Sequence, residues 1–168
     1  MKIRQRLRRE DGAAAVEFAL IVGVLAMLIF GMLQFGLTFF ELQNLRASAR
    51  EGARIGAVGA TPDTIRTRIA GASNGAISQA ESSLGFIQVQ YSDDGSTNWV
   101  TRTGNSVPAC SSGTPGSKAL AAVRTQISVA TAPAHLKDLF TVNIPLLPRI
   151  TMTPVVDAQF RCEGVAST

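Results

Sequence analysis

The sequence contains little of what catalysis and metal binding require. It has one histidine, two cysteines and no Cys-x-x-Cys pair among its 168 residues. A zinc site needs about four nitrogen, sulfur or oxygen ligands, usually closely spaced. No glycine-rich phosphate loop or nucleophile elbow is present, and His135 has no obvious relay partner. The sequence therefore favours a protein that is not an enzyme, and it predicts no cofactor and no metal.

Aromatic residues and charge in the body of the chain are also scarce. Aromatic residues make up 6% of the chain, too few for stacking on nucleic acid. The net charge of +4 comes from 16 basic and 12 acidic residues, but five basic and two acidic residues fall in the first 12 positions. The remainder has 11 basic and 10 acidic residues, a net charge of +1. The basic character belongs to the N-terminal flank, so no nucleic-acid partner is predicted.

What the sequence does contain is one long apolar run. Residues 18–40 form a stretch of 23 residues in which Gln34 and Thr38 are mild interruptions. As a helix this stretch is about 34 Å long, enough to cross a bilayer core of about 30 Å. A secretory signal has a shorter apolar region of about 7 to 15 residues, and the Ala-x-Ala match at residues 47–49 lies beyond charged Glu41. The run therefore predicts a membrane anchor.

The charges that flank this run set its orientation. Five Lys or Arg residues precede it, whereas the basic residues after it are partly balanced by Glu41 and Glu51. The positive-inside rule then places the N-terminus in the cytoplasm and residues 41–168 outside it. In that compartment a disulfide between Cys110 and Cys162 is favoured over two free thiols. Under the chain-entropy account it would stabilise the fold by about 4 kcal/mol.

A short motif lies at the start of the apolar run. Residues 8–20 read R-R-E-D-G-A-A-A-V-E-F-A-L, in which Gly12 follows a basic leader and Glu17 and Phe18 come five and six residues later. Farther along, residues 49–54 read A-R-E-G-A-R. In these features, over about a third of the chain, the sequence resembles the TadE-like pseudopilins of the tight-adherence (Flp-type) pilus system.

One departure from that family pattern lies early in the apolar run. The family often has a proline there, and this chain has Val22, Gly23 and Val24 instead. The difference leaves the motif around Gly12 intact, but it can alter the curvature of the helix.

The resemblance implies a processing step. A membrane-embedded prepilin peptidase would cut after Gly12 and leave Ala13 as the new N-terminus. Glu17 of a neighbouring subunit would then neutralise the new amine, and this pairing would set the register between adjacent helices. The implied partners are the peptidase, other pilin and pseudopilin subunits, the inner-membrane assembly platform and membrane lipid. The implied location is a bacterial inner membrane, crossed once, with the head in the periplasm; incorporation into a surface pilus is left open.

The helix is expected to continue beyond the membrane. Apolar and small residues recur at helical spacing up to glycines at 56 and 59. We therefore divide the chain into a cytoplasmic leader at residues 1–12, a hydrophobic assembly helix at residues 13–57 and a small extracytoplasmic head at residues 58–168. Thr61 and the following Pro62 are typical of the start of a second helix.

The head is expected to have an α+β fold. From Leu84 onward the apolar residues recur with a period of two, and Asp93-Asp94-Gly95 is a turn signal rather than a calcium loop. These patterns predict three to five antiparallel strands packed against the distal helix. Pro154 interrupts the final strand, which indicates a sheet edge or a bulge.

The sequence leaves a second interpretation open. The chain can also be read as an unprocessed, single-span, membrane-anchored binding or sensor protein whose periplasmic head recognises a ligand. The two interpretations differ at the N-terminus: the mature chain starts at Ala13 under the first and at Met1 under the second.

Overall fold

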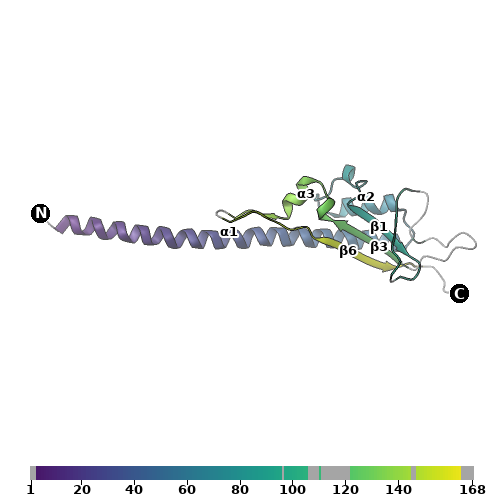
Figure 1. The fold of residues 1–168 in the computed structure, drawn as a ribbon, viewed down its shortest axis with the longest axis horizontal. Coiled ribbons are helices and arrows are strands. Elements are labelled where there is room, and N and C mark those ends of the chain that lie inside the picture. Colours follow the sequence, from purple (N-terminus) through teal and green to yellow (C-terminus); the bar gives the residue numbers. More distant parts are fainter. Residues whose placement is uncertain (1–2, 96, 106–109, 111–121, 145–146, 164–168) are drawn as a thin grey trace, which may run out of the picture.

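The computed structural model shows a long helical rod with a small head at one end (Figure 1). It describes residues 3–95, 97–105, 110, 122–144 and 147–163. The rod is α1 (Ile3–Ala57), a single helix of 55 residues. It begins ten residues before the position expected from the sequence, because the leader contains no proline and is rich in residues with good helix propensity.

The head is an α+β unit, as predicted. Its four-stranded antiparallel sheet has the order β2-β1-β3-β6, and a separate two-stranded sheet pairs β4 with β5. In chain order the elements after α1 are α2 (Pro62–Ala72), η1 (Gln79–Glu81), β1 (Ile87–Ser92), β2 (Val100–Arg102), β3 (Ala122–Ser128), η2 (Val129–Thr131), α3 (Ala134–Leu139), β4 (Thr141–Val142), β5 (Ile150–Thr151) and β6 (Val155–Arg161).

The core of the head lies between the sheet and the distal half of α1. One stripe of α1 is fully buried, with a spacing of four residues: Leu45, Ala49, Ala53 and Ala57. On the facing strand β3, Val123, Thr125 and Ile127 alternate inward with a period of two. The Thr125 hydroxyl donates to the Ala49 carbonyl oxygen at 2.7 Å, so the one polar group on this face is paired.

Helix α2 forms the second element of the helical layer. Its start is as predicted: Thr61 is the N-cap, and its hydroxyl oxygen accepts from the Thr64 N–H at 3.4 Å. Ile65 and Ile69 are fully buried against α1. The chain then turns away after Ala72 through Asn74, which has a φ of +54°.

Pro154 divides the final strand into two pieces that have different partners. β6 pairs with β3 at the edge of the main sheet, as the proline predicts. β5 instead pairs with β4, with Thr141 opposite Thr151. The resulting β4–β5 hairpin leaves the sheet and runs back along α1 toward the N-terminus (Figure 1).

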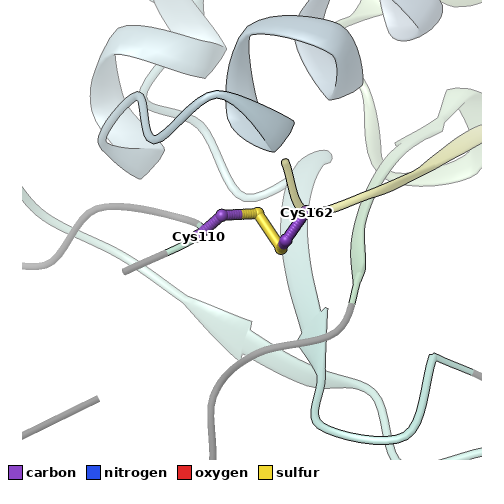
Figure 2. The surroundings of a disulfide bond; sticks show 2 residues. All are labelled: Cys110 and Cys162. Atoms are coloured by element: carbon purple, nitrogen blue, oxygen red, sulfur yellow. A yellow bond between two sulfur atoms is a disulfide. The ribbon is translucent and has the colours of Figure 1, made fainter. Parts of the chain in front are cut away.

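The predicted disulfide is present. Cys110 and Cys162 are joined with their Cα atoms 5.4 Å apart, at the distal end of the head (Figure 2). Next to it, the N–H of Glu163 donates to the Ala57 carbonyl oxygen at 2.9 Å. The bridge ties the chain at Cys110 to the end of β6, and the hydrogen bond holds the end of β6 against the end of α1. Most of the Gly/Ser/Pro-rich loop around Cys110 lies outside the described residues.

Candidate functional site

The N-terminal half of α1 is apolar and open to its surroundings. Every residue from Gly12 to Leu25 is exposed, including Ala13, Glu17 and Phe18. Phe18 is 67% exposed and Leu20 is 70% exposed. α1 is long and apolar enough to cross a membrane, and none of its most apolar 18-residue stretch is buried. The core helix of a soluble protein would be mostly buried, so the exposure points to a lipid-facing segment.

Gly12 lies inside a regular helix, ahead of the apolar run. A Cβ added there would have nothing within 4 Å, so packing does not demand glycine. Glycine lowers helix stability by about 1 kcal/mol relative to alanine. It therefore makes this position one where the helix opens more easily and where the backbone is not covered by a side chain.

The Glu17 carboxylate has no hydrogen bond or ion pair with any other residue in the described part of the chain. Gly31, which contacts Ile144 of the head, lies 14 residues or about 21 Å farther along the helix than Glu17. The described side chains therefore give Glu17 no partner.

The second motif, at residues 49–54, has a structural explanation. Its small residues are buried: a Cβ at Gly52 would lie 2.7 Å from the Ile69 Cδ1 atom, so α2 packs directly on this backbone. Its charged residues face outward. The Glu51 carboxylate accepts from Arg54 at 2.8 Å and from Arg68 of α2 at 3.1 Å. These hydrogen bonds lower the pKa of Glu51 to about 2. The motif thus docks α2 onto α1.

A second functional face of α1 was not identified from the sequence. Of the polar interruptions of the apolar run, Gln34 faces the β4–β5 hairpin and Thr38 faces the end of α3, just before it. The Gln34 amide, in the orientation that satisfies both partners, donates to the Asn143 carbonyl oxygen at 3.0 Å and accepts from the Asn143 N–H at 2.9 Å. The Thr38 hydroxyl lies 3.4 Å from the Leu139 carbonyl oxygen.

Gly31 completes this face, since a Cβ there would lie 3.6 Å from the Ile144 Cδ1 atom. Gly31, Gln34 and Thr38 are spaced by three and four residues and so share one side of the helix. That spacing, in an otherwise apolar run, was the signal that could have revealed a docking face.

The described part of the head offers no arrangement suited to catalysis. It contains no group of three or more His, Cys, Asp or Glu residues that could hold a metal. His135 lies at the surface, 3.4 Å from Glu81. The Tyr91 hydroxyl is buried without a hydrogen-bond partner among the described residues, and burial raises its pKa. With Tyr91 only 1% exposed, no substrate could reach it.

Comparison with known families identifies the N-terminal segment. The sequence model of the family described as TadE-like protein matches residues 12–54. The match begins at Gly12, covers the apolar run and ends at Arg54, so it contains Gly12, Glu17 and Phe18 of the first motif, the whole second motif and the face formed by Gly31, Gln34 and Thr38. The resemblance to TadE-like proteins is therefore confirmed for this segment. Searches of curated proteins and of solved structures found no match.

Proposed function

We propose that this chain is a minor pseudopilin of a tight-adherence pilus system, processed by a prepilin peptidase after Gly12. It acts in assembly or initiation of the pilus or as one of its minor subunits. The observation that carries the proposal is the TadE-like match beginning at Gly12. It falls on a helix whose most apolar stretch is not buried against the rest of the protein. The partners are the peptidase, other pilin and pseudopilin subunits, and the inner-membrane assembly platform.

The role proposed for the first half of α1 is to pack beside other helices in the inner membrane. The N-terminus lies in the cytoplasm and the head in the periplasm. Cleavage leaves a positive amine on Ala13 at the membrane edge. Glu17 of an adjacent subunit, one helical turn along, neutralises that amine. A buried ion pair of this kind contributes mainly to register, because desolvation offsets much of its attraction.

The state of the N-terminus tests the processing step. The full chain is produced with and without the prepilin peptidase, and its intact mass is measured. We expect a chain that starts at Ala13 only when the peptidase is present. A start at Met1 in cells that process another prepilin of the same system would refute the proposal and favour an unprocessed anchored sensor.

Variants at Gly12 make this test specific. Gly12→Ala, and more strongly Gly12→Val, should leave the leader attached. Gly36→Ala is the matched control, because neither glycine has an atom within 4 Å of an added Cβ. Processing of the control should be normal. Loss of processing in both variants would mean that helix stability, and not the cleavage motif, is being measured.

Glu17→Ala tests the register role separately. The variant should be cleaved but should fail to assemble, as judged by crosslinking to other subunits and by its recovery in sheared filaments or membrane complexes. Glu41→Ala is the control, a carboxylate on the same helix whose hydrogen-bond partner is Asn44, at 3.4 Å. Normal assembly of Glu17→Ala would show that the carboxylate does not set the register.

A further inference from the structure

The depth of the β4–β5 hairpin relative to a bilayer follows from the length of the apolar run. The run begins at Phe18, directly after Glu17. A bilayer core of about 30 Å takes about 20 residues of an upright helix, so its outer boundary falls near Thr38. Gly31, which contacts Ile144 of the hairpin, is seven residues or about 10 Å on the lipid side of that boundary. Any tilt of α1 would place the hairpin deeper.

The described side chains at this end of the hairpin suit such a position. Leu147 is 47% exposed and Ile150 is 49% exposed, although both are large apolar residues. Arg149, which lies between them in sequence, is also exposed. A long basic side chain at the edge of an apolar surface can extend its charged end to the lipid headgroups.

Several backbone polar groups of the described residues in this region are paired, which lowers the free-energy cost of placing them in lipid. The side-chain amide of Gln34 satisfies both backbone groups of Asn143. The N–H of Leu147 donates to the Ile144 carbonyl oxygen at 3.1 Å. The sequence here also includes prolines at 145 and 148, which have no N–H to leave unpaired.

The apolar surface continues from the hairpin toward the head. An open groove of about 580 Å³ lies between α1 and the segment around Pro154. Its lining is formed almost entirely by apolar side chains, including Phe35, Phe39, Leu42, Phe140 and Met152. The groove therefore connects the lipid-facing half of α1 to the base of the head without a polar break.

We propose that the hairpin is a second membrane contact, which inserts Ile144, Leu147 and Ile150 among the acyl chains of the outer leaflet. Arg149 binds the phosphate of a lipid headgroup. Gly31 and Gln34 hold the hairpin at this depth, and Thr38 contacts the end of α3 beside it, so that the head rests on the bilayer at a fixed height. This inference depends on the proposed anchoring of α1 in a membrane, and the experiment below tests the two separately.

Tryptophan fluorescence can locate the hairpin, because the chain has a single tryptophan, Trp99. Leu147→Trp is made on a Trp99→Phe background, and the full chain is reconstituted at low protein-to-lipid ratio in vesicles that contain bromine-labelled lipid. Bromine on the acyl chains should strongly quench the indole introduced at position 147. Its emission should also lie at shorter wavelength than that of the same variant unfolded in urea. Ile150→Trp is a second reporter in case position 147 does not tolerate the change.

Two controls show the quenching expected inside the bilayer and outside it. Leu28→Trp, on the same background, reports the middle of the apolar run and should be quenched if α1 is anchored. Wild-type Trp99 reports the head far from the bilayer and should not be quenched.

Quenching at 28 without quenching at 147 and 150 would overturn the proposal and leave the anchoring intact. Absence of quenching at 28 would overturn both. If bromine does not quench the emission at 147 but the emission changes with the protein-to-lipid ratio, the hairpin binds a second copy of this chain instead.

Discussion

The two halves of α1 form one continuous helix but are suited to different surroundings. In the apolar part of α1, residues 12–40, Leu37 is 68% exposed; only eight residues later, Leu45 is fully buried beneath the head. The apolar part carries one carboxylate, Glu17, with no partner in the described chain. The second half carries Glu51, which is paired with two arginines. At one end of the helix the apolar side chains face the surroundings, and at the other end they face the core of the head.

The difference shows why an amphipathic pattern describes only part of this helix. A helix on the surface of a globular domain keeps one apolar stripe and one polar face. Lipid removes the need for a polar face, so the first half is apolar on nearly all sides. The hairpin lies where the lipid-facing part of α1 meets the part beneath the head. There Gln34 is hydrogen-bonded to Asn143 of the hairpin, and Thr38 to Leu139 just before it.

Loss of the disulfide is expected to have the largest effect, because it should destabilise the head and leave the apolar part of α1 helical. Replacing Cys110 and Cys162 with Ser should reduce the free energy of unfolding of the head by about 4 kcal/mol. This loss of stability can be measured by unfolding the full chain with urea in detergent and monitoring the fluorescence of Trp99. Far-UV circular dichroism should meanwhile retain the helical signal of the first half of α1.

Reducing agent gives the control for this prediction. It should shift the wild-type midpoint to that of the double variant and leave the variant unchanged. An unaltered Trp99 transition after loss of the bridge would mean that the stability of the head does not depend on the link between Cys110 and the end of β6.

A matched pair of leucines compares the two halves directly. Leu45→Ala removes a fully buried side chain and should cost about 3 kcal/mol of head stability, because both transfer and cavity terms are lost. Leu37→Ala makes the same chemical change on the exposed half and should leave the Trp99 transition where it is. Equal losses in the two variants would show that the head packs against both halves.

The sequence predicted the elements of this fold better than their junctions. The long helix, the helix start at Thr61, the antiparallel sheet and the Cys110–Cys162 bridge all follow from local patterns or from compartment. The separation of β5 from β6 did not, since a proline shows where a strand breaks but not which partner the free piece will find. That choice depends on long-range packing against α1.

The candidate site was predictable to a similar degree. Gly12, Ala13, Glu17 and Phe18 were found by spacing and by family resemblance, and their proposed roles remain predictions. The docking role of Gly31, Gln34 and Thr38 was missed, because polar residues in an apolar run read as weak interruptions. Their meaning depends on α3 and the hairpin after it, which lie more than a hundred residues away in sequence.

The smallest expected effect on the stability of the head concerns the ion pairs of Glu51, which lies in the part of α1 beneath the head. Hydrogen bonds from Arg54 and Arg68 lower its pKa to about 2, against about 4.3 for an unperturbed glutamate. A lowered pKa in the folded state stabilises the head above about pH 4.3, and this contribution is lost as the pH falls toward 2. Because the pairs are open to solvent, salt should weaken them.

Glu51→Gln should therefore lower the urea midpoint of the head slightly at pH 6, and the variant and wild type should converge as the pH falls toward 2. Glu41→Gln, at the junction of the two halves, is the control for replacing a carboxylate with an amide on the same helix. A Glu51→Gln difference that persists unchanged at the lowest pH would assign the effect to packing of the side chain. A difference that disappears with added salt would show that charge, and not only buried small residues, fastens α2 to the protein-facing half of the helix.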